Sequence, residues 1–318
     1  MFKLIACLRQ LDADRFISGE VVAEKLGISR AGVSMTLARA EEYGIAIERR
    51  HGLGYRLHTP IEWLDPQLVA AGLAPGSALK VSVADSIEST NQALQAKPEH
   101  GRVLAAEWQS GGRGRMGRSW QGGIGGSLLF SLAWTFLEGP AQLVGLPLAV
   151  GVALARAIHS AGVTELRLKW PNDLLLPAGK AGGILLEMQG DAMGPAQVAI
   201  GIGINLRAPQ SWNAALDQSS AGLQECGLLL GRNALLGRSL AELEQVLEQF
   251  SREGFAPFRS EWEQCHAWQG SECEVRTPDG RQLAGTALGV AEDGALRMQV
   301  AEQEKRFYSA DVSLRRAS

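Results

Sequence analysis

A glycine-rich stretch between Gly111 and Gly126 excludes a helix from this part of the chain, because half of its sixteen residues are glycine. The segment Gly112-Arg-Gly-Arg-Met-Gly117 satisfies the G-x-G-x-x-G spacing of dinucleotide-binding folds. That fingerprint, however, requires its last glycine to open a helix. Since the residues that follow Gly117 cannot be helical, we predict an irregular loop and set the dinucleotide fingerprint aside.

Three arginines and one tryptophan lie within the same stretch: Arg113, Arg115, Arg118 and Trp120. Guanidinium groups bind phosphate or carboxylate through paired N–H donors. The combination predicts a loop that orders over an anionic ligand, with an aromatic face for a ring. It is either a phosphate-binding loop of a kind other than the P-loop, whose pattern is absent, or an arginine-rich nucleic-acid contact. A simple surface connector is the least favoured interpretation.

Composition limits the class of protein. A chain of 318 residues predicts two or three domains, and 46% hydrophobic with 20% charged residues is typical of a soluble globular protein. The net charge of −3 argues against a polybasic nucleic-acid binder, so any DNA contact must be local. The four cysteines have neither C-x-x-C nor histidine spacing, which disfavours structural zinc and disulfides. Because Arg9 interrupts the apolar start and no apolar run reaches 18 residues, we expect a cytoplasmic protein without membrane contact.

Residues 1–62 have the pattern of a winged helix-turn-helix. A short helix after Ser18, a turn at Gly27 and a second helix from Arg30 to about Glu42 precede two strand-like runs around residues 51–54. We predict that residues 19–38 bind operator DNA, with contacts from Ser29, Arg30, Ser34 and Arg39. Nine Lys/Arg against seven Asp/Glu in residues 1–60 support this only modestly. A helical bundle without a DNA role is the alternative.

Residues 67–265 alternate between strands and helices and predict one α/β domain with a mixed sheet. We expect a buried helix over residues 147–159, and the sequence Ser239-Leu-Ala-Glu242 predicts a capping box that opens another helix. The expected strands are 79–83, 103–108, 127–134, 166–169, 183–188 and 198–204. Residues 270–318 carry hairpin turns at 278–280 and 292–294, which predict a small SH3-like β-barrel. The fold class is therefore α+β and multidomain.

Several polar groups fall at expected strand or helix ends of the middle domain. Lys169, Asn172 and Asp173 follow one strand, and Lys180 lies just before the next. Ligand sites of α/β folds usually lie at such strand ends. Together with a helix start at residues 88–92 and a small-residue strand end at 201–205, they predict a pocket. It combines several cations, neutral polar groups and one carboxylate suited to help hold Mg²⁺.

These motifs, in this order, resemble those of biotin–protein ligases. The matching segments are Ser89-Thr90-Asn91, Gly112-Arg-Gly-Arg-x-Gly-Arg-x-Trp120, Lys169-Trp-Pro-Asn-Asp173, Lys180-x-x-Gly-Ile-Leu185 and Gly201-Ile-Gly-Ile-Asn205. With the N-terminal unit, the chain is similar over its whole length to the bifunctional ligases that also repress biotin synthesis genes.

The resemblance implies the chemistry and the site. Biotin is activated by ATP and Mg²⁺ to biotinyl-5′-AMP and passed to a lysine of the biotin carboxyl carrier protein of acetyl-CoA carboxylase. Lys180, Arg115 and Asp173 are the implied catalytic residues. The ureido ring or its surroundings would be held by Ser89, Thr90, Asn91 and Gln109. The loop residues Arg113, Gly114 and Arg115 would close over the ligand. Arg118 would neutralise pyrophosphate, and Trp120 would pack on the adenine. Gly112, Gly183 and Asn205 complete the implied binding set, and no metal ligand is assigned.

Three alternatives follow from the same residues, and one of them, a ligase whose head has lost DNA binding, stays open. A biotin-sensing regulator without catalysis is disfavoured by Lys180 and the arginine loop, and a lipoate-type ligase is disfavoured by that loop. Operator recognition implies a homodimer, which we expect the adenylate to promote.

Overall fold

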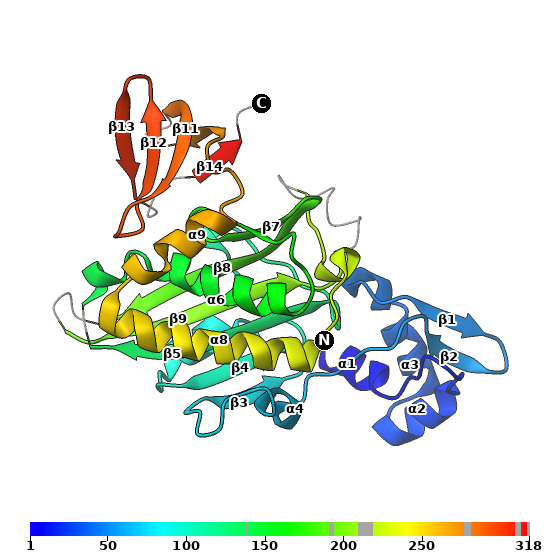
Figure 1. Cartoon of the computed structure of the whole chain (residues 1–318). Helices are drawn as coiled ribbons and strands as arrows, with labels where there is room; N and C mark the ends of the chain where they lie inside the picture. The colour runs from blue at the N-terminus through cyan, green and yellow to red at the C-terminus, as the bar shows by residue number, and fades with distance from the viewer. Residues whose placement is uncertain (138, 191–193, 209–218, 277–280, 309–312, 317–318) are drawn as a thin grey trace.

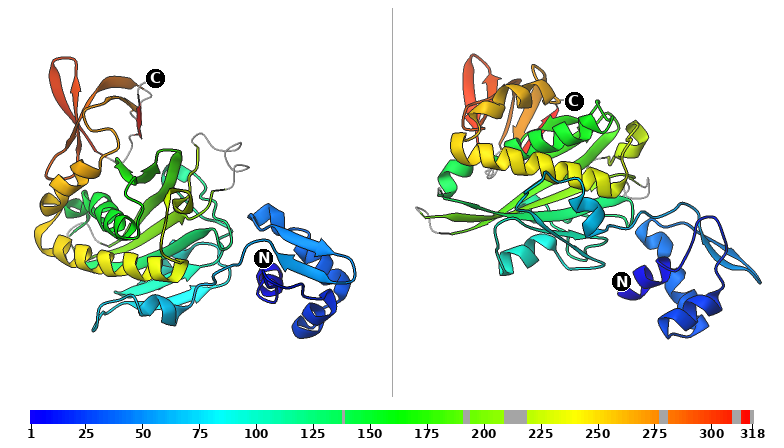
Figure 2. Two further views of the ribbon diagram at one scale, coloured as in Figure 1. Left: turned by 45° about the vertical axis from the view of Figure 1, so that its right-hand side comes forward. Right: turned by 60° about the horizontal axis from the view of Figure 1, so that its bottom comes forward.

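The computed structural model describes residues 1–137, 139–190, 194–208, 219–276, 281–308 and 313–316. Three parts follow one another along the chain (Figure 1). A small N-terminal unit lies beside a large central sheet with its helices, and a second sheet stands at the other end (Figure 2). Among these residues, no helix is long and apolar enough to cross a membrane.

The N-terminal unit, residues 1–58, contains three short helices and a hairpin. Helices α1 (Phe2–Leu8), α2 (Gly19–Leu26) and α3 (Arg30–Leu37) precede a 3₁₀ turn η1 (Ala40–Tyr43). Strands β1 (Ile47–Arg50) and β2 (Gly54–Leu57) pair antiparallel, with Ile47 opposite Leu57. Ser18 and Ser29 cap α2 and α3, and Gly27 ends α2 in the left-handed region at φ 63°. The predicted helix-turn-helix and wing are confirmed.

One prediction for this unit was wrong, and one helix was missed. Helix α3 ends at Leu37 and not near Glu42, because Arg39 leaves α geometry (φ −91°, ψ 0°) and the chain tightens into η1. Helix α1 was not predicted, since its N-cap, Met1, makes no side-chain capping bond that would have marked a start. It contributes Ile5 and Leu8 to the core of the unit.

The central sheet has seven strands in the order β3-β4-β5-β9-β8-β7-β6. It is mixed, because β3 and β4 are parallel and the remaining pairs are antiparallel. The strands are β3 (Lys80–Ala84), β4 (Arg102–Ala106), β5 (Ser127–Phe136), β6 (Arg167–Lys169), β7 (Asp173–Leu176), β8 (Gly179–Gln189) and β9 (Ala196–Asn205). The short strand β7 was not predicted, and Lys180 lies inside β8 rather than before it.

Helices cover the sheet. On one face lie α6 (Leu146–Ser160) and α8 (Arg232–Glu253), which cross in front of the strands in Figure 1. Smaller helices are α4 (Pro66–Ala70), α5 (Thr90–Ala96) and α9 (Arg259–Cys265), with 3₁₀ turns η2 (Arg115–Gly117), η3 (Pro140–Leu143), η4 (Leu223–Cys226) and η5 (Ala256–Phe258). Along β9, Ile200 and Ile204 are fully buried in the apolar core that includes α6 and α8, which leaves the glycines between them for the opposite face.

The capping box predicted at Ser239 was wrong. Helix α8 begins at Arg232, and Ser239 is a buried residue inside it. The helix is instead capped from the linker: the Glu62 carboxylate accepts hydrogen bonds from Arg232 N (2.7 Å) and Asn233 N (3.0 Å). A cap supplied from 170 residues away leaves no local sequence signal.

A buried ion pair fixes the same linker to the central domain. The Arg232 guanidinium lies 2.8 Å from Glu107 Oε2, and both side chains are at most 3% exposed. Glu107 Oε1 also accepts a hydrogen bond from Leu64 N (2.7 Å), and Arg232 donates to the Glu62 carbonyl. Further hydrogen bonds reach both carboxylate oxygens of Glu107 and both Nη atoms of Arg232, which offsets the cost of burying the two charges, while Arg232 Nε has no partner among the described residues. The segment predicted as a linker is therefore held in place, and Pro66, predicted to break structure, begins α4.

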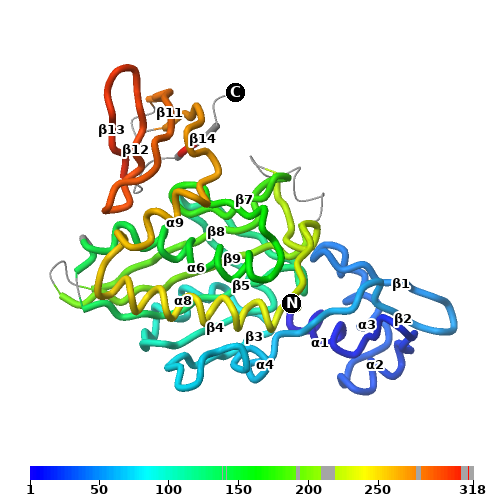
Figure 3. The backbone as a smooth tube through the Cα atoms, viewed as in Figure 1, coloured from blue at the N-terminus to red at the C-terminus, as the bar shows by residue number. Residues whose placement is uncertain are grey.

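Beyond Gly270 the chain forms a five-stranded antiparallel sheet in the order β13-β12-β11-β10-β14. Its strands are β10 (Glu272–Arg276), β11 (Gln282–Val290), β12 (Leu296–Val300), β13 (Gln303–Phe307) and β14 (Ser313–Arg316). The backbone trace in Figure 3 shows this sheet projecting beyond α9. The turn predicted at residues 292–294 joins β11 to β12, with Gly294 at φ 85°. The turn predicted at 278–280 lies outside the described residues.

A cation-rich candidate active site

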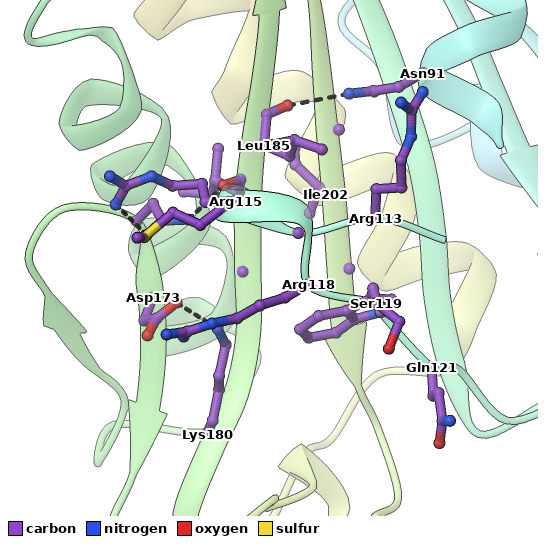
Figure 4. A pocket seen from close by; sticks show the side chains of 18 of the residues that line it. Asn91, Arg113, Arg115, Arg118, Ser119, Gln121, Asp173, Lys180, Leu185 and Ile202 are labelled. Carbon is purple, nitrogen blue, oxygen red and sulfur yellow. Dashed lines mark hydrogen bonds and ion pairs between the residues drawn. The ribbon is translucent and has the colours of Figure 1, made fainter. Parts of the chain in front are cut away.

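A pocket of about 440 Å³ opens on the face of the central sheet opposite α6 and α8 (Figure 4). The start of α5, the loop after β4, the glycine-arginine loop, the turn after β6, and strands β5, β8 and β9 all contribute to its wall. Every ligand-site residue predicted in this domain lines it except Gly112. These residues are Ser89, Thr90, Asn91, Gln109, Arg113, Gly114, Arg115, Arg118, Trp120, Asp173, Lys180, Gly183 and Asn205.

One carboxylate lies between two lysines at the charged end of the pocket. Lys180 Nζ is 2.5 Å from Asp173 Oδ1, and Lys169 Nζ is 3.6 Å from Asp173 Oδ2. Asp173 and Lys169 are nearly buried, with side chains 14% and 12% exposed, while Lys180 is 28% exposed. The cluster therefore carries a net positive charge, and Lys180 is its most accessible cation. Such a group attracts an anion into the pocket.

The glycine-arginine loop folds back on itself over this end. Gly114 N donates to Arg118 O (2.7 Å), and Arg113 pairs with Ser119 across the turn. Met116 (φ 56°) and Gly117 (φ 70°) make the reversal in the left-handed region, which explains the glycine at 117. The loop is an ordered turn and not a helix, as the sequence predicted.

Two arginines of the loop reach across to the sheet. Arg115 Nη1 donates to Asn172 Oδ1 (3.3 Å), in the turn after β6, and Arg113 lies 3.6 Å from the Glu187 carboxylate on β8. In Figure 4 the side chains of Arg115 and Arg118 extend toward the side of the pocket where Asp173 and Lys180 lie. A closed arrangement of this kind places guanidinium groups around any anion held beside Lys180.

The other end of the pocket is neutral and polar. Ser131 Oγ donates to Asn91 Oδ1 (2.6 Å), and Asn91 Nδ2 donates to Glu187 Oε2 (2.9 Å). Thr90 N donates to Gln109 Oε1 (2.7 Å). This connected set of donors and acceptors suits an uncharged polar heterocycle. Ser131 was missed in the sequence, although a serine inside the apolar run of β5 was a usable signal.

Two glycines of β9 make room for pocket side chains. A Cβ atom at Gly201 would lie 2.5 Å from Asn91 Oδ1, and one at Gly203 would lie 2.4 Å from Trp120 Cε2. The Trp120 ring consequently packs on bare backbone, with Lys180 Nζ 5.6 Å from its centroid. Trp120 Nε1 and Asn205 Oδ1 are buried without a hydrogen-bond partner among the described residues. Because such groups are costly to leave unpaired, both are candidates for ligand contact.

The C-terminal sheet also reaches this site. Leu314 of β14 lines the pocket, and Trp170 Nε1, beside Lys169, donates to the Gly294 carbonyl (3.2 Å). Sequence reasoning missed Leu314, because nothing in a single apolar residue marks it as a ligand neighbour. No group of three or more potential metal-ligating side chains occurs in the described part of the chain.

The predicted DNA-contact residues lie apart from this pocket, on the N-terminal unit. Arg30 is exposed and Ser34 is half-buried on α3. Ser29 Oγ accepts the capping bond from Gly32 N, and Arg39, beyond the end of α3, donates to Glu42 and Tyr43. The pKa of Arg39 is raised by its hydrogen bond to the Glu42 carboxylate. Among the predicted DNA-contact residues, Arg30 is therefore the one that lies exposed within α3 itself.

The fold and the pocket together define a ligase-type domain with a helix-turn-helix head. A sequence profile of the biotin/lipoate A/B protein ligase family matches residues 83–205, one of the biotin protein ligase C-terminal domain matches 270–315, and one of a helix-turn-helix domain matches 3–56.

The chain belongs to the biotin protein ligase family. It is 35% identical to the bifunctional ligase/repressor BirA of Escherichia coli, across 99% of this chain and 97% of that protein. Identity to BirA of Bacillus subtilis is 30%, across 95% and 94%. The biotin protein ligase of Aquifex aeolicus in complex with biotin and ATP is 27% identical and superposes with a TM-score of 0.64, covering 75% of this chain and 99% of that one.

Proposed function

We propose that the protein is a biotin–protein ligase that joins biotin to a carrier protein at the expense of ATP. The observation that carries the proposal is the pocket itself. It places a neutral polar end, suited to the ureido ring, beside a cluster of lysines and arginines suited to a carboxylate and phosphates. The similarity to a ligase solved with biotin and ATP supports the same reading.

The reaction has two steps. In the first, a carboxylate oxygen of biotin attacks the α-phosphorus of ATP, the bond to the β-phosphate breaks, and pyrophosphate leaves. In the second, a lysine amine of the carrier protein attacks the acyl carbon, loses a proton, and displaces AMP. Two anions must meet in the first step, so cations that screen their repulsion lower its barrier.

Lys180 is the residue we assign to that screening, because it is the most accessible cation of the cluster. It would contact the biotin carboxylate and the α-phosphate as charge develops between them. Asp173 orients Lys180 and the incoming carrier lysine. Arg113, Gly114 and Arg115 form the lid, which keeps water from the mixed anhydride.

The remaining predicted residues divide between the two ligands. Thr90, Asn91 and Gln109, with Ser89 as the cap of α5, hold the ureido ring and its surroundings. Trp120 packs on the adenine and Arg118 binds pyrophosphate. Gly183 and Asn205 line the nucleotide side, and Gly112 acts only by holding the backbone beside Trp120.

Magnesium fits this pocket as the ion that accompanies ATP. Mg²⁺ usually keeps several waters and binds substrate phosphates, with one or two carboxylates at most. Both oxygens of Asp173 already face lysines, so the ATP phosphates and water would supply most of the ligands, with Asp173 at the edge of the ion's surroundings. The ion would neutralise phosphate charge, and the chain's own residues position the reactants.

We further propose that the N-terminal unit binds operator DNA as part of an adenylate-promoted homodimer, and that the carrier is that of acetyl-CoA carboxylase in the cytoplasm. The helix-turn-helix match and the similarity to the BirA repressors support this extension. Sedimentation in the presence and absence of adenylate tests the dimer, and equal association in both would reject it.

The deciding experiment measures transfer of labelled biotin to a purified carrier domain with Mg·ATP, using wild type and Lys180→Ala. We expect transfer by the wild type and a loss of about a hundredfold or more in the variant. Tight biotin binding without transfer would instead favour a biotin-sensing regulator.

A further inference from the structure

Lys169 is held differently from its neighbour Lys180. Asp173 lies 2.5 Å from Lys180 but 3.6 Å from Lys169, so the shared carboxylate is closer to the more exposed lysine. Yet the Lys169 side chain is only 12% exposed, against 28% for Lys180. An ammonium group so far removed from water is stabilised by negative potential around it.

The face of the Trp268 ring is one source of such potential. Lys169 Nζ lies 5.0 Å from the centroid of the Trp268 ring, within the range of a cation–π contact. Trp268 belongs to the connector that joins α9 to β10, in the direct path between the central domain and the C-terminal sheet. No predicted site motif includes it.

The connector is fixed on both sides of Trp268. Ala267 N donates to the Leu168 carbonyl (2.8 Å), which ties the connector to the residue immediately before Lys169. Gly270 N donates to the Ala287 carbonyl (2.8 Å) in β11, and Gln269 Nε2 donates to the Leu288 carbonyl (3.1 Å). The ring is therefore held against Lys169 by hydrogen bonds to both domains.

We propose that Trp268 is a positioning residue for the charged end of the pocket. Its ring holds the Lys169 ammonium on one side of Asp173. The carboxylate then remains on Lys180, and Lys180 is directed toward the entering anions. Without the ring, Lys169 competes for Asp173 and draws it away from Lys180. This inference rests on the proposed ligase function.

The test combines Trp268→Leu, Trp268→Phe, Lys169→Gln and the double variant Trp268→Leu/Lys169→Gln. Biotin-dependent exchange of pyrophosphate into ATP reports the first step, and calorimetry reports biotin affinity. We expect Trp268→Leu to lower kcat for exchange by roughly threefold to thirtyfold, the range of a partly desolvated cation–π contact. Trp268→Phe should restore much of that loss, and biotin affinity should not change, because the polar end of the pocket is separate.

The double variant distinguishes positioning from packing. If the ring acts through Lys169, Trp268→Leu has no further effect once Lys169→Gln is present. An equal loss in both backgrounds, or a Trp268→Phe variant as slow as Trp268→Leu, would overturn the proposal. A wild-type chain that shows no exchange at all would reject the ligase function itself, which is a separate and recognisable result.

Discussion

Tyr43 of the N-terminal unit packs edge-on against Trp108 of the central domain, with ring centroids 5.8 Å apart and ring planes at 85°. Trp108 directly precedes Gln109, which lines the pocket and accepts a hydrogen bond from Thr90. The contact with the head and the wall of the ligand site are therefore made by two adjacent residues. A movement of this backbone on ligand binding would therefore alter both the Tyr43–Trp108 contact and the position of Gln109.

Replacing Tyr43 tests this contact. We expect Tyr43→Ala to weaken the docking of the head by about 1 kcal/mol or more, because an edge-to-face aromatic pair is lost together with buried area. Tyr43→Phe keeps the ring and loses only the hydrogen bond from Arg39, so it is the matched control. Small-angle scattering with thermal unfolding measures the change, and identical behaviour of the two variants would contradict the prediction.

Gly201→Ala and Gly203→Ala, both in strand β9, are expected to weaken the binding of different substrates. A methyl group at 201 collides with Asn91 and should raise the KM for biotin, whereas one at 203 displaces Trp120 and should raise the KM for ATP. We expect at least a tenfold change in each, since displaced polar and aromatic contacts cost about 1.4 kcal/mol or more. Steady-state kinetics with each substrate varied in turn would show the separation.

The control for these two variants is Gly151→Ala in α6, where an added Cβ meets Leu168 at an ordinary 3.5 Å. It should leave both KM values within about twofold of wild type. If all three variants raise both KM values together, the assignment of the two glycines to different ligands is wrong.

Arg115→Gly should release the adenylate before transfer. Arg115 links the glycine-arginine loop to Asn172, so its removal opens the lid over the mixed anhydride. We expect faster dissociation of biotinyl-5′-AMP and nonspecific biotinylation of bystander proteins. A variant that retains the intermediate as tightly as wild type would remove the lid role.

Acid should destabilise the fold through His266. Burial lowers the pKa of this residue from 6.5 to about 4. The unfolded chain therefore takes up a proton in this window that the folded chain does not, so stability is present above about pH 6.5 and falls as the pH drops toward 4. The expected loss is about 3 kcal/mol. Calorimetry should show a shallower pH dependence for His266→Gln, and His51→Gln, on the exposed wing, should behave as wild type.

Local signals were sufficient for most of the elements. An amphipathic run after Ser18 and a serine cap at 29 marked two helices of the head, and apolar runs marked six of the seven central strands. The motif residues also came together as predicted, but on the face of the sheet opposite α6 and α8 and not only at strand ends, since Gly183, Gly201 and Gly203 lie within β8 and β9. The start of α8 could not be predicted, since its cap, Glu62, comes from a distant part of the chain.

Trp268 could not be predicted, because it reaches the site through Lys169 and belongs to no motif. Ser131 lines the pocket and bonds to Asn91, and its place inside an apolar run was a signal that could have been used. Register and three-dimensional proximity, which a single sequence does not contain, decide such contacts.

Ile124, two residues before the end of the glycine-rich stretch, is only 1% exposed and belongs to the apolar cluster of the N-terminal unit, against which Trp63 and Trp108 also pack. Removal of residues 1–60 would expose these three side chains to water as an apolar patch prone to aggregation. The N-terminal unit therefore also covers apolar surface of the central domain. A lineage that discarded it would first have to acquire polar residues at these positions, and anyone trimming the chain in the laboratory should do the same.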